Sequence, residues 1–187
     1  MKFDKYADKY DYNFMGKGSK KFYIDLIKEL NIKDGDSVLD VGCGTGSILS
    51  YIGNRNTITG FGLDISENML AIAQEKNPNC SFIIGNSAIL PFADQSMDVV
   101  IACMAYHHFP NQRQFREEAW RVLKPGGSLY ISDPRFPGII RGILNTFFQD
   151  AGFHTTKKNT YDFEKRGFIT KAIVKDMYVQ ILHFVKE

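Results

Sequence analysis

The chain has 187 residues, of which 44% are hydrophobic and 24% charged, and its formal net charge is +2. This length predicts one domain with a substantial core, and the near-neutral charge excludes a global attraction to nucleic acid or to an anionic membrane. No apolar run is long enough to cross a bilayer, and no leader peptide is recognisable. The three cysteines form no C-x-x-C pair, so neither a disulfide framework nor a zinc site is indicated, and we expect a cytoplasmic protein.

The first 20 residues combine tyrosine and phenylalanine with Lys and Asp and then reach Gly16 and Gly18. We expect a short amphipathic helix followed by a flexible link. Ser19 is expected to cap the next helix, 19–31, whose apolar residues recur at helical spacing.

The remaining chain alternates between strand and helix patterns. Strands are expected at 37–41, 57–63, 81–84, 97–103, 128–132, 153–158 and 177–185. Helices are expected at 46–53, 66–76, 111–123 and 138–151, and 161–172 is also expected to be helical. This alternation predicts an α/β fold in which helices cover both faces of a mostly parallel sheet.

Residues 38–46 read VLDVGCGTG, a short buried strand followed by a glycine-rich turn. Gly42, Gly44 and Gly46 allow the backbone to turn tightly and to approach a ligand closely. The helix that follows directs its unpaired N–H groups toward that ligand. Asp64 closes the next strand, where a carboxylate can accept both hydroxyls of a ribose. The pattern therefore predicts a site for a nucleoside-containing cofactor.

The glycine spacing is G-x-G-x-G rather than the dinucleotide pattern G-x-G-x-x-G, and Asp40 precedes it within the strand. A carboxylate at that position would repel a pyrophosphate and would suit a cofactor with a cationic amino-acid end. The segment VLDVGCGTG resembles the first motif of class I S-adenosylmethionine-dependent methyltransferases. PFADQSMDVVIACMAYHHFPN and EEAWRVLKPGGSLYISDP resemble later segments of that superfamily, so the likeness runs from about residue 35 to 134.

Among subgroups, FDKYADKYD and the HHF at 107–109 are most similar to small-molecule enzymes, including those that C-methylate quinones. The resemblance implies a Rossmann-like class I methyltransferase fold over residues 1–187, with a seven-stranded sheet whose last strand is antiparallel. It also implies that residues 1–20 form an aromatic lid, which would exclude water from the sulfonium centre.

The resemblance further implies which residues hold S-adenosylmethionine. Asp40 is expected to hold the amino-acid end of the cofactor, and Asp64 its ribose. The glycine turn, with Cys43, is expected to contact the cofactor through its backbone. The other expected contacts are Ile65, Met69, Asn86, Ser87, Cys103 and Tyr10. Asn86 stands where the family usually has an acidic residue, and its side-chain carbonyl can still accept from an adenine amino group. Tyr10, with Tyr6 and Tyr12, could contact the sulfonium by cation–π interaction, or could simply belong to an exposed helix.

His107 and His108 follow the strand 97–103, where methyltransferase substrates usually sit, and are the candidate catalytic bases. His108 is favoured, while either histidine could instead bridge a loop, and Tyr106 is a weaker candidate. Cys103 is interpreted as an apolar wall rather than a nucleophile because no neighbour in sequence would lower its pKa.

Three alternatives stay open from the sequence. A nucleic-acid methyltransferase is disfavoured because ACMAYHHF lacks the [NDS]-P-P-[YF] tetrapeptide of enzymes that methylate base amines, while methylation of RNA or of a protein stays open. A non-catalytic S-adenosylmethionine-binding protein or activator subunit would fit Asn86 and the short substrate region. An oxidoreductase would place Asp40 against a pyrophosphate. The favoured interpretation is a small-molecule methyltransferase with no metal, no nucleic-acid partner and no membrane association.

Overall fold

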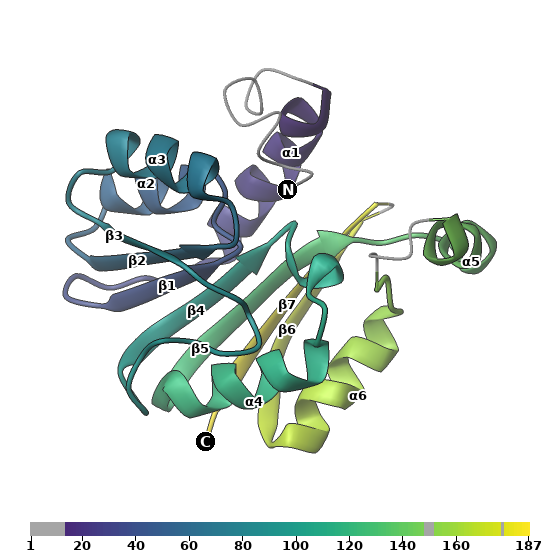
Figure 1. The fold of residues 1–187 in the computed structure, drawn as a ribbon. Helices are drawn as coiled ribbons and strands as arrows, with labels where there is room; N and C mark the ends of the chain where they lie inside the picture. Colours follow the sequence, from purple (N-terminus) through teal and green to yellow (C-terminus); the bar gives the residue numbers. More distant parts are fainter. Residues whose placement is uncertain (1–13, 148–151, 177) are drawn as a thin grey trace.

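The computed structural model describes residues 14–147, 152–176 and 178–187, and they form one seven-stranded sheet with helices on both faces (Figure 1). The strands are β1 (Ser37–Val41), β2 (Thr59–Asp64), β3 (Ser81–Ile84), β4 (Met97–Cys103), β5 (Leu123–Pro134), β6 (Phe168–Lys175) and β7 (Val179–Lys186). The helices are α1 (Phe14–Glu29), α2 (Ser47–Gly53), α3 (Glu67–Lys76), the 3₁₀ turn η2 (Tyr106–His108), α4 (Gln112–Val122), α5 (Gly138–Phe147) and α6 (Thr156–Arg166).

The sheet has the strand order β3-β2-β1-β4-β5-β7-β6. Strands β1 to β5 pair in parallel, and β7 pairs antiparallel with both β5 and β6. The direction of winding reverses between β1 and β4, and in open α/β sheets the crevice outside the carboxyl ends at such a point is where ligands bind. The predicted fold class, including the antiparallel last strand, is confirmed.

Two apolar layers hold the helices to the sheet, and β4 contributes to both because side chains alternate along a strand. Val100 and Ala102 join the layer that contains the buried rings of α4 and α6, among them Phe115 and Phe163. Val99, Ile101 and Cys103 join the opposite layer, which contains residues of α1 and α2 such as Leu26 and Leu49. Strand β4 is therefore buried on both faces, as its continuous apolar sequence indicates.

The expected strand 153–158 is wrong, because Thr156 already begins α6. The Thr155 hydroxyl accepts from the Lys158 N–H and caps this helix, so the threonine pair acts as a helix start rather than as β-branched strand residues. Gly167, at a φ of 119°, ends α6. The stretch 161–172 is therefore helical only up to Arg166, and β6 begins at Phe168.

The expected link before residue 19 is also wrong. Helix α1 begins at Phe14 and runs through Gly16 and Gly18, so Ser19 lies inside the helix instead of capping it. A contiguous helix tolerates glycine when its later turns are anchored, as Leu26 anchors α1 in the core. Within the described residues, no helix is long and apolar enough to cross a membrane.

Candidate cofactor pocket

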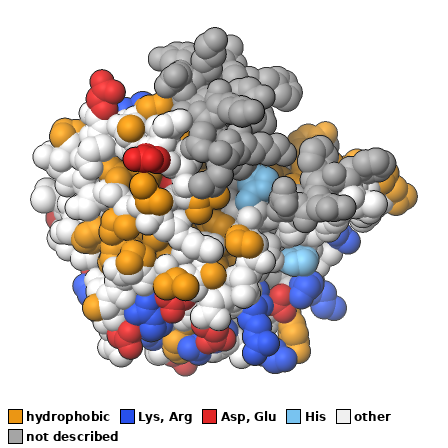
Figure 2. Space-filling model, in the orientation of Figure 1, with side chains coloured by type: hydrophobic (Ala, Val, Ile, Leu, Met, Phe, Trp, Pro, Cys, Tyr) orange, Lys and Arg blue, Asp and Glu red, His pale blue; other side chains and the backbone are white. Residues whose placement is uncertain are grey.

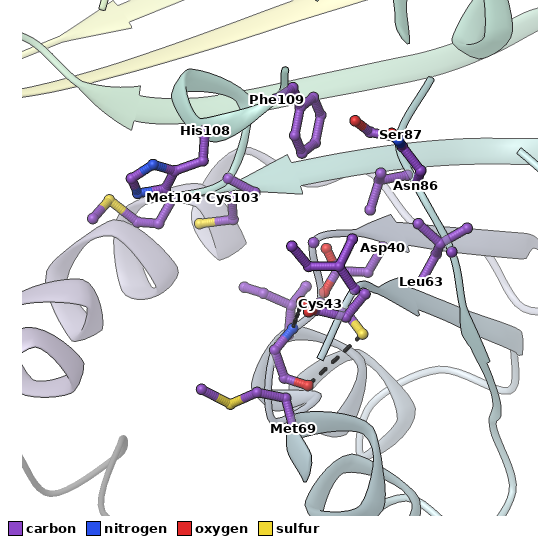
Figure 3. A pocket seen from close by; sticks show the side chains of 18 of the residues that line it. Asp40, Cys43, Leu63, Met69, Asn86, Ser87, Cys103, Met104, His108 and Phe109 are labelled. Atoms are coloured by element: carbon purple, nitrogen blue, oxygen red, sulfur yellow. Dashed lines mark hydrogen bonds between the residues drawn. The ribbon is translucent and has the colours of Figure 1, made fainter. Parts of the chain in front are cut away.

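A cavity of about 260 Å³ opens at the carboxyl ends of β1, β2 and β4, at the point where the winding reverses (Figure 3). Its walls come from the turn after β1, from the ends of β2 and β3, from η2 and from α1. Ten of the predicted site residues line it: Asp40, Gly42, Cys43, Gly44, Asp64, Ile65, Met69, Asn86, Ser87 and Cys103. His108 lines it as well, so most of the predicted set lies in one cavity.

Asp64 accepts hydrogen bonds that fix the turn after β1 to the end of β2. One carboxylate oxygen, Oδ2, accepts from the Gly44 N–H at 2.9 Å, and the other, Oδ1, accepts from the Ser66 N–H at 2.9 Å. A carboxylate at the end of this strand can accept from the hydroxyls of a ribose. Gly44 has a φ of 51°, and a Cβ built there would meet nothing within 4 Å. The turn thus presents bare backbone beside a fixed carboxylate, which suits a ribose.

The other two glycines of the motif have different surroundings. A Cβ on Gly42 would lie 2.5 Å from the Ala105 Cβ, so glycine lets the turn pass against the segment after β4. Gly46 does not line the pocket, although the sequence placed it at the cofactor. A Cβ there would lie 2.7 Å from Asn77 Nδ2 and 3.0 Å from the Ala73 Cβ, so Gly46 serves close packing of α2 on α3.

Asp40 lies at the base of the cavity with 2% of its surface exposed. Burial, and secondarily the negative charge of Asp64, raise the pKa of this carboxyl from 3.8 to about 7. A cationic group bound beside Asp40 would stabilise its ionised form, whereas a pyrophosphate would oppose it. The electrostatics of the cavity therefore favour a ligand that carries positive charge at this end.

The two sides of the cavity differ in chemistry. Asn86 and Ser87 stand on one side of Asp40, and Met104 and His108 stand on the other (Figure 3). The Asn86 side-chain oxygen accepts from the Ala88 N–H at 2.9 Å, which fixes the amide and leaves one lone pair for a ligand. Met69 is buried and lines the pocket, so it belongs both to the α3 core and to the apolar wall.

The two histidines of η2 face different environments. His108 is exposed and lines the pocket. His107 is buried and does not line it. The Nδ1 atom of His107 lies 2.9 Å from Asp133 Oδ1, the His107 backbone N–H donates to Asp133 Oδ2, and Phe153 stacks on the ring at 4.6 Å. His107 thus anchors η2 to the end of β5, which positions its neighbour His108 at the cavity.

Comparison with known proteins identifies the family. Residues 39–131 match a family model described as a methyltransferase domain. Demethylmenaquinone methyltransferase of Chlorobaculum parvum is 35% identical over 133 residues, which are 67% of this chain and 55% of that protein. The same enzyme of Listeria welshimeri is 36% identical over 141 residues, 69% of this chain and 58% of that protein.

Solved structures share the fold. A chain from the complex that contains the Haloferax volcanii Trm112 methyltransferase activator superposes with a TM-score of 0.86 at 21% identity, covering 98% of this chain and 96% of that one. A SAM-dependent methyltransferase from Aquifex aeolicus gives 0.72 at 21% identity, covering 94% and 100%. The chain belongs to the class I methyltransferase superfamily. It spans a little over half the length of the curated relatives that it matches.

The pocket fits S-adenosylmethionine, the cofactor of the superfamily to which the chain belongs. The open space over Gly44, the fixed carboxylate of Asp64 and the buried carboxyl of Asp40 match a ribose and a cationic amino-acid end. The two buried thiols that line the pocket, Cys43 and Cys103, have pKa values raised well above the ordinary thiol, chiefly by burial. They are therefore apolar walls rather than nucleophiles.

Several lining residues of the methyltransferase pocket escape sequence reasoning. Tyr23 of α1 and Pro110 line the wall, and no local pattern marks them as site residues, whereas Phe109 beside them belongs to the HHF motif. Tyr106, a weaker candidate base, is buried away from the pocket. Its hydroxyl accepts from Arg116 Nη1 at 2.9 Å, and burial raises its pKa to about 12. Tyr10 lies outside the described residues.

Proposed function

We propose that the protein transfers the methyl group of S-adenosylmethionine to a small-molecule acceptor. The observation that carries this proposal is the convergence of Asp40, Gly44 and Asp64 in one cavity with His108 on a facing wall. The matches to a methyltransferase domain and to demethylmenaquinone methyltransferases support it. The three free cysteines support a reducing, cytoplasmic setting, and the small net charge disfavours a nucleic-acid acceptor.

Methyl transfer is an in-line displacement, in which the acceptor attacks the methyl carbon and the sulfonium leaves as a neutral thioether, S-adenosylhomocysteine. Asp40 binds and orients the cationic end, and Asp64 binds the ribose hydroxyls, so the carboxylates fix the direction of approach. His108 lines the pocket and can accept the proton that the acceptor loses. Phe109 and Met104 supply an apolar wall, which excludes water from the reacting atoms.

We further propose an aromatic hydroquinone-type acceptor. Its support is the name of the relatives, demethylmenaquinone methyltransferase, together with the apolar wall of Met104, Phe109 and Pro110 beside His108. A flat aromatic ring would pack against this wall, and His108 would take the proton that a hydroxyl or ring carbon loses.

Calorimetry with S-adenosylmethionine and S-adenosylhomocysteine tests the cofactor proposal. We expect micromolar binding to the wild type and at least tenfold weaker binding to Asp64→Ala. Glu75→Ala removes an acidic side chain from α3 that does not line the pocket, and it should bind as the wild type does. Tighter binding of NAD than of S-adenosylmethionine by the wild type would overturn the proposal in favour of an oxidoreductase.

Transfer of a labelled methyl group to a panel of acceptors tests the second step. Reduced naphthoquinones should be methylated faster than catechols, small amines and total RNA. Methylation of RNA alone would overturn the choice of a small-molecule acceptor without affecting the cofactor proposal.

The near full-length match to a chain of an activator-containing complex favours one second candidate, in which the chain binds the cofactor but turns over only with a partner subunit. Micromolar cofactor binding, no methylation of any acceptor by the purified chain, and methylation in extract from its source organism would favour this candidate. Turnover by the purified chain alone would exclude it.

A further inference from the structure

Residues 85–96 connect β3 to β4 without forming a helix or a strand. The first three of them, Gly85, Asn86 and Ser87, line the cofactor pocket, whereas later ones contact α4. Figure 1 shows the connection between β3 and β4 approaching α4, and Figure 2 shows basic and acidic side chains intermixed over the surface where α4 lies. A segment without secondary structure forms a fixed pocket wall only when other elements hold it, because ordering its backbone costs conformational entropy.

Arg121 of α4 holds this connection with its whole guanidinium group. Nη2 donates to the Leu90 carbonyl at 2.9 Å, and Nη1 donates to the Phe92 carbonyl at 2.7 Å and to Asp94 Oδ1 at 2.8 Å. Nε and Nη2 also donate to the two carboxylate oxygens of Glu118, at 2.9 and 2.8 Å. A guanidinium has five N–H donors in a fixed planar arrangement, and these contacts use all five.

Glu118 holds the same connection from the preceding turn of α4. Its Oε2 accepts from the Leu90 N–H at 2.7 Å. Leu90 is therefore bound through its N–H by Glu118 and through its carbonyl by Arg121, and its side chain is 2% exposed and belongs to the core. The side chains of Arg121 and Glu118 are themselves 31% and 13% exposed, so water competes for these bonds less than at an open surface pair.

The pocket end of the connection is a tight turn at Asn86. The Asn86 carbonyl accepts from the Ile89 N–H at 3.0 Å, and Asn86 Oδ1 accepts from the Ala88 N–H at 2.9 Å. The turn is joined to the end of β2 where the Gly85 N–H donates to the Asp64 carbonyl at 2.9 Å. At its other end, Leu90 joins the turn to α4. The position of Asn86 in the pocket therefore depends on bonds that α4 makes four residues further along the chain.

We propose that Arg121 and Glu118 are positioning residues for cofactor recognition, which act through Leu90 to fix the Asn86 turn against the base of the cofactor. Neither residue lines the pocket. The inference rests on the proposed function, because a ribose bound at Asp64 directs its base toward the neighbouring end of β3. There Asn86 Oδ1 can accept from the amino group of adenine, whereas the carbonyl of hypoxanthine would place two acceptors opposite each other.

A second arginine provides a matched control for a purely stabilising role. Arg166 of α6 forms an ion pair with Glu117 of α4, and its guanidinium carbon lies 4.7 Å from the centre of the Trp120 ring. This pair joins α4 to α6 instead of to residues 85–96, and Arg166 does not line the pocket. If the Arg121–Glu118 pair only stabilised the fold, substitutions at Arg121 and Arg166 would both lower the free energy of unfolding and leave cofactor recognition unchanged.

Calorimetry with S-adenosylhomocysteine and with its hypoxanthine analogue, S-inosylhomocysteine, tests the proposal on full-length protein whose folding is checked by circular dichroism. We expect the wild type to prefer the adenine compound at least tenfold. Arg121→Gln should bind that compound at least tenfold more weakly and should retain less than a threefold preference. Arg121→Lys should behave similarly, because one ammonium group cannot bond both backbone carbonyls and Glu118 at once. Arg166→Gln should keep the wild-type affinity and preference.

Glu118→Gln provides a second, milder variant that tests the same proposal if Arg121→Gln does not fold. Its amide has a single acceptor oxygen in place of the two that bind Leu90 and Arg121, and we expect the preference for adenine to fall at least threefold.

Three outcomes would overturn the positioning role while leaving the proposed function intact. They are a wild type that binds both compounds equally well, folded variants at Arg121 or Glu118 that keep the wild-type preference, and an Arg166→Gln variant that loses as much preference as Arg121→Gln. A wild type that binds neither compound would instead refute the proposed function, and the positioning role with it.

Discussion

The ionisation of Asp40 links stability to cofactor binding. Its carboxyl keeps a proton in the folded protein up to a pH of about 7, whereas an ordinary Asp loses it near 3.8. Between these values the unfolded chain binds fewer protons than the folded one, so the free energy of unfolding falls as pH rises. A pKa displaced this far corresponds to about 4 kcal/mol at most.

The Asp40→Asn variant should therefore be more stable than the wild type above pH 7. Asparagine does not ionise, so the buried charge is avoided. We expect the advantage of the variant to grow with pH, so that the difference between the two thermal midpoints is about 4–10 °C larger at pH 8 than at pH 5, measured by circular dichroism. An equal difference at both pH values would show that packing rather than ionisation is responsible.

Cofactor affinity should increase as pH rises and Asp40 ionises, whereas the free energy of unfolding decreases. A cation beside the carboxylate favours its ionised form, so binding should release a proton and weaken up to tenfold per pH unit below 7. Titrations between pH 5.5 and 7.5, where an α-amino group is still protonated, measure this. Asp40→Asn should bind at least tenfold more weakly at pH 7.5 and without pH dependence. A wild-type affinity that does not change over this range would contradict the assignment.

The adjacent histidines should respond differently to substitution. His108→Ala removes the group that faces the cavity, and we expect turnover to fall 10²–10⁴-fold with cofactor affinity within about threefold. His107→Ala removes a buried ring and leaves Asp133 Oδ1 without its imidazole partner. We expect it to lower the free energy of unfolding by about 2–4 kcal/mol. These roles would be reversed if a His107→Ala variant of normal stability lost turnover and the His108→Ala variant kept it.

At the scale of the element, the glycine turn meets two requirements, close approach to a ligand and close packing against a helix. Its sequence does not show which glycine serves which requirement. The G-x-G-x-G pattern predicts a tight turn, but it does not tell which glycine faces a ligand and which faces a helix. That distinction depends on Asn77 and Ala73, which α3 brings to Gly46 from 27 to 31 residues away in sequence.

Two substitutions separate these roles. Gly46→Ala forces a Cβ against Asn77 and α3, and we expect it to lower the free energy of unfolding by about 2–3 kcal/mol without a specific loss of affinity. Gly44→Ala meets no protein atom, so beyond strain at positive φ it should mainly weaken S-adenosylmethionine binding, by tenfold or more. Gly35→Ala, also at positive φ with open space around it, controls for backbone strain alone. Equal loss of affinity at Gly44 and Gly46 would contradict this division.

Local patterns predict the elements between residues 37 and 122 well, because turn residues separate the strands from the helices there and side chains cap α3 and α4. Ser66, for example, accepts from the Met69 N–H and starts α3 where the sequence indicates. After Pro134 the helix that begins at 138 and the last strand are predicted correctly, but the sixth strand is misplaced, because the β-branched residues at 155–156 serve as a cap and first turn while the strand lies at 168–175. The expected number of strands was right, but one of them was assigned to the wrong segment.

The candidate site was predictable where one motif carries it and not where distant elements meet. Asp40, Gly44 and Asp64 lie within 25 residues and share a recognisable pattern. Tyr23 and the pairing of His107 with Asp133 arise only when α1, η2 and the end of β5 pack together. Asp133 lies in the SDP that ends β5, yet no local signal connects it to a histidine 26 residues earlier.

At the scale of the whole molecule, the pocket lies where the two halves of the sheet meet at the β1–β4 pair. Residues from both sides of the switch point line it, namely Asp64 and Asn86 on one side and Met104 and His108 on the other. A ligand that contacts both sides stabilises the folded state by mass action, by about 2.7 kcal/mol at 100 times its dissociation constant.

Saturating S-adenosylmethionine or S-adenosylhomocysteine should therefore raise the thermal midpoint by about 5–10 °C, and NAD should not. Hydrogen exchange locates the effect: amides of the turn 42–47 and of 104–110 should gain protection, because the ligand bridges them across the switch point. Strand β6, at the far edge of the sheet, should exchange at the same rate with and without ligand until global unfolding. Protection confined to one side of the switch point would mean that the ligand does not bridge the cavity, and stabilisation without protection at 42–47 would place the ligand elsewhere.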